Sequence, residues 1–202
     1  MIAIIDYDAG NIKSVEKAFE ALSQDAIITR DKDKILSADH VVLPGVGSFG
    51  DAMEKLSKYE LIPVIEKVVK DGTPFLGICL GLQLLFESSE ESLGVKGLSL
   101  LEGQIVKIPE GEYKKIPHMG WNDLTLKGEG RLFKDLPDNP YVYFVHSYYL
   151  KAKEESIVKA TTDYNITIHA SVEKDNIFAC QFHPEKSSDV GLTILKNFIS
   201  IK

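Results

Sequence analysis

The chain has 202 residues, of which 44% are hydrophobic, and 30 acidic against 23 basic side chains give it a formal net charge of −7. This length and hydrophobic content suit one compact domain over residues 1–202, with at most an elaborated sheet edge. Because Lys and Arg form no clustered basic stripe, the charge pattern argues against a nucleic-acid partner. We expect small molecules or proteins as partners instead.

The N-terminal stretch MIAIIDYDAG has neither a basic start nor a small-residue cleavage site, which argues against a signal peptide. No later apolar run is long enough to span a bilayer, so no membrane association is expected. Two cysteines, Cys79 and Cys180, provide neither a disulfide framework nor the spacing of metal ligands. We therefore expect a cytoplasmic protein without a metal site.

Short apolar runs alternate with helical patterns in the first part of the chain. Buried strands are predicted at residues 1–7, 26–30, 40–44 and 74–78. Apolar residues at three- and four-residue steps from Ile12 to Leu22 predict an amphipathic helix, and a long helix is predicted from about residue 50 to 69. This β-α-β-α order predicts an α/β fold with a doubly wound, mostly parallel sheet covered on both faces.

The second part of the chain changes character after residue 98. Apolar segments then follow one another closely, with turns between them, at residues 98–109, 141–151, 156–164, 166–174 and 176–184. Such spacing predicts an antiparallel or mixed extension of the sheet. A final helix is predicted over 189–199, and no repeat or Pro/Gly-rich linker marks a domain boundary.

Residues 45–50, GVGSFG, match the G-x-G-x-x-G pattern of dinucleotide-binding loops. The match follows the third predicted strand and not the first, and no acidic residue ends a following strand to hold a ribose. A Walker A loop is ruled out because no Lys-Ser or Lys-Thr follows the glycines. We therefore expect no nucleotide or other cofactor, and interpret the segment as a glycine-permitted loop at the carboxyl end of a parallel strand, where open α/β sheets place their sites.

Residues 77–81, GICLG, are the cysteine form of the G-x-S-x-G elbow, in which a strand turns sharply into a helix and presents a nucleophile. The glycines make room for the turn, and the positive potential of a helix N-terminus lowers the pKa of a thiol. The alternative is that Cys79 is a buried apolar residue, and spacing alone does not separate the two interpretations. Cys180, which lacks flanking glycines, is expected to be structural.

A nucleophilic cysteine needs a base and a group that orients the base. His183 is the candidate among the five histidines, because Pro184 ends its strand and Glu185 follows two residues later. This alternation could point the imidazole and the carboxylate in the same direction. The alternative is a strand-end histidine near the surface and a solvated carboxylate. Together with Cys79, the two residues suggest a Cys-His-Glu arrangement.

The pair GICLGLQ and QFHPE resembles the class I glutamine amidotransferases. The stretches IIDYDAGNIKSV, LPGVGSFGDAM, KIPHMGWN and YFVHSYY stand in collinear order and are similar to the glutaminase subunits of imidazole glycerol phosphate synthases, enzymes of histidine biosynthesis. The resemblance implies hydrolysis of L-glutamine to glutamate and ammonia by Cys79, His183 and Glu185. It also implies a heterodimer with a (βα)8-barrel cyclase subunit, which uses the ammonia to make imidazole glycerol phosphate and an aminoimidazole carboxamide ribotide.

The resemblance also assigns roles to single residues. It implies that the backbone N–H groups of Val46 and Leu80 stabilise the oxyanion, and that a peptide flip in the loop 44–47 switches the activity. The implied glutamine-binding residues are Gly47, Gln83, Glu91, Ser147 and Tyr148. The implied contacts with the cyclase are Asn11, Trp121, Tyr143 and Lys186.

Simpler interpretations stand beside these roles. Gln83 has an independent argument, because it follows Cys79 by four residues on the expected helix and shares its face. Glu91 could be a solvated charge in an acidic run, and Lys186 a surface charge. Trp121 and Tyr143 could be aromatic residues of the core.

Two other functions remain open from the sequence. A glutaminase that supplies a different synthase would keep the triad but would not account for HMGWN and PGVGSFGDAM. A non-catalytic, flavodoxin-like binding module would account for the sheet and for GVGSFG, with Cys79 inert.

Overall fold

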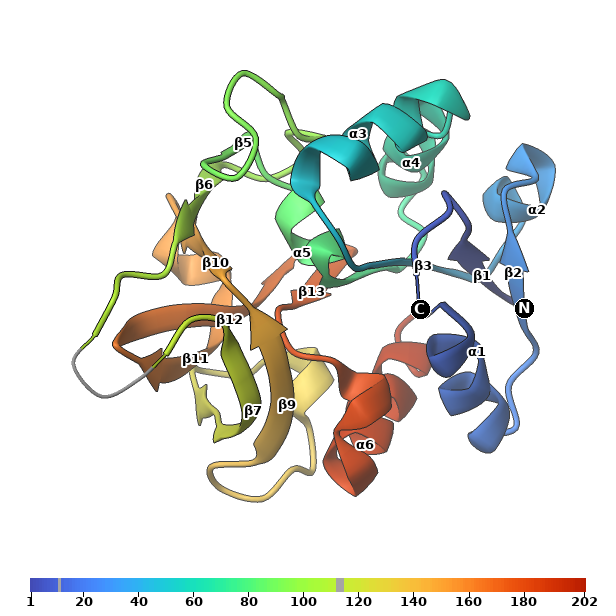
Figure 1. Cartoon of the computed structure of the whole chain (residues 1–202). Coiled ribbons are helices and arrows are strands. Elements are labelled where there is room, and N and C mark those ends of the chain that lie inside the picture. The colour runs from blue at the N-terminus through green and yellow to red at the C-terminus, as the bar shows by residue number, and fades with distance from the viewer. Residues whose placement is uncertain (11, 112–114) are drawn as a thin grey trace.

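A computed structural model describes residues 1–10, 12–111 and 115–202 of the chain, and a sheet with helices on both faces forms its centre (Figure 1). One half of the sheet is parallel, in the order β2–β1–β3–β4–β13. The bounds of these strands are Ile2–Ile5 for β1, Ala26–Thr29 for β2, His40–Gly45 for β3, Phe75–Cys79 for β4 and Ile177–Cys180 for β13. The predicted α/β class with a mostly parallel sheet is confirmed.

Helices cover both faces of the parallel half (Figure 1). On one face lie α1 (Ile12–Ala21) and α6 (Ser188–Ile199), and on the other α2 (Lys32–Leu36), α3 (Phe49–Lys58), α4 (Ile62–Lys70) and α5 (Leu80–Leu84). Alternation within β1 explains both layers, because Ile4 packs in the cluster of α1 and α6 and Ile5 in the cluster of α3 and α4. The strands are therefore continuous apolar runs.

The other half of the sheet is mainly antiparallel, as predicted. From β13 it continues through β12 (Ile166–Lys174), β10 (Tyr148–Ala152), β6 (Gly103–Lys107) and β5 (Ser88–Ser89), while β11 (Val158–Tyr164) pairs with β12 and with β8 (Thr125–Leu126). A separate antiparallel ribbon joins β7 (His118–Asp123) to β9 (Tyr141–His146). Short 3-10 helices stand at Arg131–Phe133 (η1), Glu155–Ile157 (η2) and Pro184–Lys186 (η3).

The prediction of one long helix over residues 50–69 is wrong, because the segment forms two helices, α3 and α4. The helical path is interrupted at Glu60, whose φ of 53° lies in the left-handed region. Pro63 then stands in the first turn of α4, where its missing N–H leaves no hydrogen bond unmade. Both helices bury apolar residues in the same core cluster, so their shared periodicity concealed the break.

The predicted strand over 141–151 is also wrong as a single element. It divides at Ser147 into β9, which belongs to the ribbon, and β10, which belongs to the main sheet. Strand β7 was missed because His118 is the one fully buried residue in it, so no apolar alternation marks it. Helix α2 was missed as well, and its start is set by Asp31, whose side chain accepts hydrogen bonds from the N–H groups of Asp33 and Lys34.

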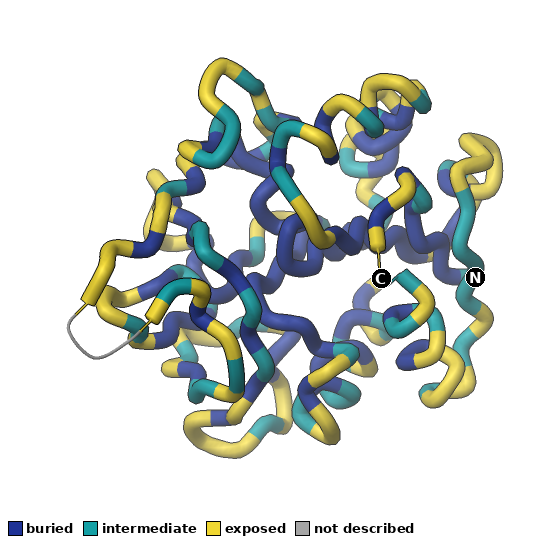
Figure 2. The backbone as a smooth tube through the Cα atoms, in the orientation of Figure 1, coloured by how far each residue is buried: buried dark blue, intermediate teal, exposed yellow. Residues whose placement is uncertain are grey.

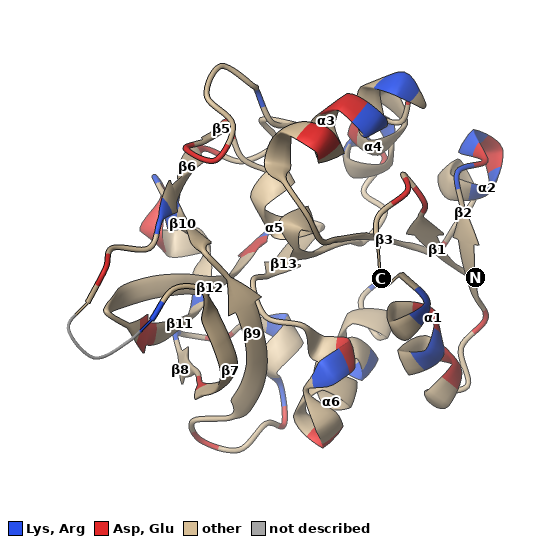
Figure 3. Ribbon diagram, viewed as in Figure 1, with Lys and Arg blue, Asp and Glu red and all other residues tan. Residues whose placement is uncertain are grey.

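Burial and charge follow these layers. Figure 2 shows the central strands buried and the connecting loops exposed. Strands β1, β3, β4 and β13 carry no Lys, Arg, Asp or Glu, and the charges lie mainly on the helices and loops around them (Figure 3). Within the described parts of the chain, none of the helices combines the length and the apolar character needed to cross a membrane.

We predict that Phe198→Ala destabilises the fold strongly. Phe198 is fully buried beneath the sheet, and its ring meets those of His40 and Phe178 edge-on. Truncation should leave a cavity and lower the free energy of unfolding by about 3–5 kcal/mol. Lys196→Ala on the exposed side of the same helix should change it by less than about 0.5 kcal/mol. Urea unfolding of the two variants measures the difference, and equal effects would contradict the assigned packing of α6.

Candidate active site

Cys79 ends strand β4 and stands at a sharp turn into helix α5. Its φ of 54° and ψ of −107° are rare for a residue with a side chain and indicate a strained backbone. The flanking glycines are needed for the turn. A Cβ on Gly81 would lie 1.8 Å from the carbonyl oxygen of Leu43, and a Cβ on Gly77 would lie 2.8 Å from that of Gly81. The predicted strand–turn–helix context of the elbow is therefore present.

The sheet brings two loops to Cys79. Strand β4 lies between β3 and β13, with Gly45 opposite Cys79 and Cys180 opposite Ile78. Because these strands are parallel, the loop that begins with residues 44–47 and the segment 181–185 both leave the sheet at the edge where Cys79 stands. Cys180 itself is fully buried, and burial, together with Glu185 and Cys79, raises the pKa of its thiol well above the usual range, as suits a structural residue.

His183 and Glu185 form a buried pair. The imidazole Nδ1 lies 2.8 Å from Oε1 of the carboxylate, and the side chains are 3% and 2% exposed. The main chain of His183 is also held, because its N–H donates to the carbonyl of Tyr143 and its carbonyl accepts from the hydroxyl of Ser187. With Nδ1 engaged, Nε2 is the nitrogen left for chemistry, and it makes no hydrogen bond within the described residues.

The pKa of His183 depends on opposing effects. Burial acts to lower the pKa, but the interactions with Cys79 and with Glu185 outweigh burial and raise it to about 10. The sulfur and the imidazole are therefore close neighbours. A cationic imidazole is the partner that a thiolate nucleophile requires.

A cavity of about 350 Å³ opens beside Cys79, within the range of roughly 300–1,000 Å³ that is usual for small-molecule sites. Its lining includes residues expected from the sequence: Val46, Gly47, Cys79, Leu80, Gln83, Glu91, Ser147, Tyr148 and His183. Three further lining residues were not expected: Pro117, Val145 and His146. Glu185 stands behind His183 and is not among the lining residues. Over residues 1–10, 12–111 and 115–202, no cluster of His, Cys, Asp or Glu is arranged to hold a metal ion.

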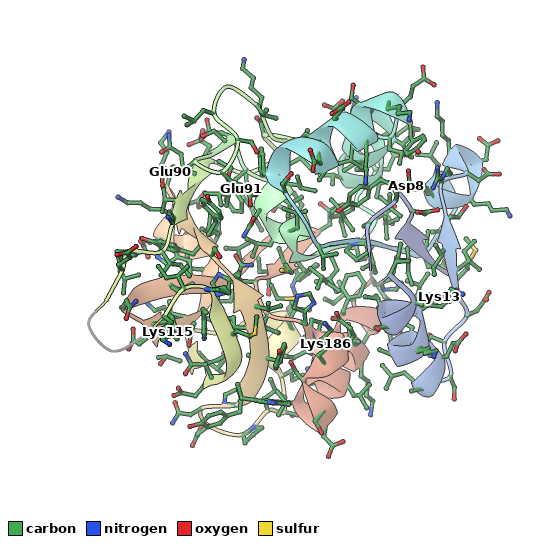
Figure 4. All side chains as sticks on the ribbon, viewed as in Figure 1. Asp8, Lys13, Glu90, Glu91, Lys115 and Lys186 are labelled. Carbon is green, nitrogen blue, oxygen red and sulfur yellow. The ribbon has the colours of Figure 1, made fainter. Side chains whose placement is uncertain are left out.

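Glu91, labelled in Figure 4, has a structural partner and is not a solvated charge. Its carboxylate accepts a hydrogen bond of 2.7 Å from the N–H of Phe49, the first residue of α3. The neighbouring Ser92 hydroxyl accepts another from Gly50. Since α3 directly follows the loop 44–47, Glu91 both lines the cavity and anchors the end of that loop.

Tyr7 anchors the other end of the loop and was missed in the sequence. Its hydroxyl donates to the carbonyl of Pro44 at 2.9 Å, and a Cβ on Gly45 would lie 2.3 Å from that hydroxyl. Burial, and secondarily the nearby Cys79, raise the pKa of Tyr7 far above its ordinary value, so the phenol remains a neutral donor. Only the three-dimensional contact with Pro44 identifies this role.

Two of the expected partner contacts, Trp121 and Lys186, are exposed. Trp121 on β7 is 53% exposed and meets the half-buried Tyr143 on β9 edge-on, with ring centroids 6.1 Å apart. The interpretation of Trp121 as a core aromatic is therefore wrong. Lys186, labelled in Figure 4, is exposed on η3 directly after Glu185. Asn11 lies outside the described residues.

A buried histidine pair beside the cavity was also missed. Nδ1 of His146 lies 2.8 Å from the carbonyl oxygen of Tyr148, and its Nε2 lies 3.0 Å from Nδ1 of His118. Burial lowers the pKa of His146 to about 4, so the ring is neutral near pH 7. The motifs HMGWN and FVHSYY contain both residues, but they lie on different strands and nothing in their spacing indicates that they meet.

We predict that His146 makes the fold sensitive to acid. Below its ordinary pKa of 6.5 the unfolded chain binds a proton at this position, whereas the folded chain does so only near pH 4. The contribution of His146 to stability should therefore fall by about 3 kcal/mol as the pH is lowered from 6.5 to 4. Urea unfolding at pH 7 and pH 4.5 should show a smaller loss for His146→Gln than for the wild type, and parallel losses would disprove the assignment.

Comparison with known proteins adds to this geometry. The family described as glutamine amidotransferase class-I matches residues 3–201. The imidazole glycerol phosphate synthase subunit HisH of Geobacter metallireducens is 50% identical over 202 residues, which cover 98% of this chain and 96% of that relative. The subunit of the same name from Methanocaldococcus jannaschii is 48% identical over 201 residues, with 100% of both chains covered.

Solved structures show the same fold at much lower identity. A crystal structure of a glutamine amidotransferase superposes with a TM-score of 0.75 at 18% identity, covering 98% of this chain and 99% of the other. The structure of PurLQS from Thermotoga maritima gives a TM-score of 0.73 at 19% identity, covering 98% and 96%. These likenesses concern the arrangement of the elements and confirm the predicted fold class.

Proposed function

Because this chain belongs to the class I glutamine amidotransferase family, we propose that it hydrolyses L-glutamine to glutamate and ammonia as the glutaminase subunit of an imidazole glycerol phosphate synthase, in histidine biosynthesis. The names of its relatives support this assignment. The observation that carries the proposal is the buried pair of His183 and Glu185 beside Cys79 in one cavity. In this proposal residues 1–202 act as one domain. We also propose a cytoplasmic location, because two unpaired cysteines suit a reducing compartment.

In the first step, the sulfur of Cys79 attacks the side-chain carboxamide carbon of glutamine. The thiol proton passes to Nε2 of His183, which then gives it to the departing nitrogen, so that ammonia leaves and a thioester remains. Glu185 holds the proton on Nδ1 and stabilises the imidazolium. This role is supported by Nε2 of His183 itself, which makes no hydrogen bond within the described residues and so remains able to exchange a proton with the substrate.

In the second step, water attacks the thioester carbon. His183 accepts a proton from the water and returns it to the sulfur of Cys79 as glutamate leaves, which restores the starting state. Both steps pass through a tetrahedral oxyanion. We assign its stabilisation to the backbone N–H groups of Val46 and Leu80, since both residues line the same cavity as Cys79.

Residues around the cavity suit the two ends of glutamine. Glu91 offers a carboxylate to the α-ammonium group, while Gly47, Ser147 and Tyr148 line the wall available to the rest of the substrate. Gln83 also lines the cavity, but its side-chain amide is engaged by the carbonyl of Tyr148. We therefore assign Gln83 to the floor of the glutamine site.

Ammonia released here must reach an acceptor before it is protonated, which favours direct transfer to a partner enzyme. From the resemblance to subunits of imidazole glycerol phosphate synthase, we propose a (βα)8-barrel cyclase subunit as this partner in a heterodimer. Trp121, Tyr143, Lys186 and, from the sequence, Asn11 are the proposed contacts. Tyr143 is linked directly to the proposed catalytic base, because its carbonyl oxygen accepts a hydrogen bond from the N–H of His183. A partner that binds the β7–β9 ribbon could therefore shift β9, the strand that holds the main chain of His183.

We predict that Cys79→Ala abolishes glutaminase turnover measured with the cyclase subunit and its nucleotide substrate present. Loss of the nucleophile should lower kcat by about 10³-fold or more. Cys180→Ala is the matched control, since it removes a buried thiol one strand away and should retain turnover. Glutamate release by both variants is the measurement. Absence of turnover in the wild type would instead favour a binding module with an inert cysteine.

We also predict that Trp121→Ala weakens binding to the cyclase subunit. Trp121 is exposed, and tryptophan is enriched among interface hot spots, whose truncation costs about 2 kcal/mol or more. Such a loss corresponds to a dissociation constant at least about 30-fold higher. Ile166→Ala, which truncates an exposed apolar residue on β12, should leave the constant unchanged. Calorimetric titration with the cyclase subunit tests both, and equal constants for Trp121→Ala and wild type would exclude Trp121 from the interface.

A further inference from the structure

Gln181 is a buried polar residue that the chemistry above does not use. It directly follows β13 and is completely buried, and its side-chain Nε2 lies 3.7 Å from the sulfur of Cys79. Its Oε1 lies 3.1 Å from Nε2 of Gln83. The sulfur of Cys79 thus has two polar neighbours: the side-chain amide of Gln181, next to the end of β13, and the imidazole of His183, which lines the cavity.

The hydrogen-bond chain determines which end of the Gln181 amide faces the sulfur. The carbonyl oxygen of Tyr148 can only accept, so the group of Gln83 that lies 3.1 Å from it must be the NH₂ group. The same NH₂ group then donates its second hydrogen to Gln181, which must present its oxygen there. The NH₂ group of Gln181 is therefore the end that faces Cys79, because a flipped amide would place two NH₂ groups against each other.

The carbonyl of Tyr148 also determines which ring nitrogens of His146 and His118 carry a hydrogen. Nδ1–H of His146 donates to the oxygen of Tyr148, which leaves Nε2 of the neutral ring to accept from Nδ1–H of His118. Nε2 of His118 in turn lies 3.4 Å from the side-chain NH₂ of Asn122. One acceptor thus orders a chain of hydrogen bonds that runs from β7 to the nucleophile. Both lone pairs of the Tyr148 oxygen are occupied, so neither Gln83 nor His146 is free to reverse.

We propose that Gln181 is a positioning residue for the nucleophile: its N–H, held toward Cys79 by Gln83 and the Tyr148 carbonyl, stabilises the thiolate form of the sulfur. The thiol of Cys79 donates to the carbonyl oxygen of Val145, which lies 4.0 Å from the sulfur, and this oxygen would repel the ionised sulfur. The thiolate therefore needs a donor from another group. The proposal rests on Cys79 as the nucleophile assigned above. It adds a neutral donor, from the residue that follows β13, to the interaction of the sulfur with His183.

The test compares Gln181→Met and Gln181→Glu with the wild-type chain. Methionine keeps the length of the side chain but cannot donate, and glutamate keeps the shape but places an acceptor, charged when ionised, against the sulfur. The titratable groups around Cys79 are His183, Glu185, Tyr7 and Cys180, together with Glu91, His146 and Tyr148 in the cavity lining, and neither variant replaces any of them. Ser171→Ala is the matched control, because the Ser171 hydroxyl is equally buried and bonds to the carbonyl of Ala179 beside the site.

The readout is the pH profile of Cys79 alkylation by iodoacetamide, followed by mass spectrometry. Loss of a hydrogen bond to an ionised group should move the midpoint up by about one pH unit in Gln181→Met, which is about a tenfold lower rate below the midpoint. The shift should be larger in Gln181→Glu and absent in Ser171→Ala. Glutaminase kcat should fall with the alkylation rate, while KM for glutamine changes less, because Gln181 does not line the cavity.

Three results would overturn the proposal: a midpoint unchanged in Gln181→Met, a shift of equal size in Ser171→Ala, or a smaller shift in Gln181→Glu than in Gln181→Met. A measurement on the wild type covers the case in which the variants do not fold. The NMR signals of the Gln181 side-chain amide should move with the same pH midpoint as alkylation, and a pH-independent signal would also refute the contact. A wild-type chain without reactive Cys79 and without turnover would count against the proposed function instead.

Discussion

The site depends on one steric constraint, the contact between two main chains where β4 turns into α5. A Cβ on Gly81 would fall within bonding distance of the carbonyl oxygen of Leu43 on the neighbouring strand, so only glycine allows the helix to start there. This close approach places Cys79 in its strained conformation at the end of the sheet. It also brings the loop 44–47 beside the sulfur, because Leu43 leads directly into that loop. The proposed nucleophile and the loop to which we assign oxyanion stabilisation are thus positioned by the same contact.

Two buried histidines near this turn, His183 and His146, differ in charge because their neighbouring groups differ. His183 and His146 both lose water on folding, and burial acts to lower the pKa of each. The neighbours of His183 are a carboxylate and a thiol, so its pKa rises and a cation is favoured. The neighbours of His146 are a carbonyl oxygen and a second imidazole, so its pKa stays low and the ring remains neutral. The charge of His183 thus suits the proton transfers that we propose for it, while His146 keeps a fixed pattern of donor and acceptor.

The division of the strand at Ser147 joins the two sheets at the cavity. Val145 and His146 end β9 in the β7–β9 ribbon, and Tyr148 begins β10 in the main sheet. All of these residues line the cavity, so its wall crosses from one sheet to the other. The carbonyl of Tyr148 is bound from both sides, by His146 of the ribbon and by Gln83 of α5. A change in the position of the ribbon would therefore alter the hydrogen bonds that run from His146 through Tyr148, Gln83 and Gln181 to Cys79.

The sequence by itself determined the fold class and indicated the elbow at Cys79 and the pairing of His183 with Glu185, because each depends on neighbours within a few residues. Apolar periodicity, flanking glycines and the spacing of two residues are local signals. The break at Glu60, the division at Ser147, the anchor at Tyr7 and the amide of Gln181 were decided only by tertiary structure. Their partners lie on other strands or helices, up to 102 residues away in the case of Gln181 and Cys79. A hydrogen bond depends on distance in space, and folding alone brings such groups together.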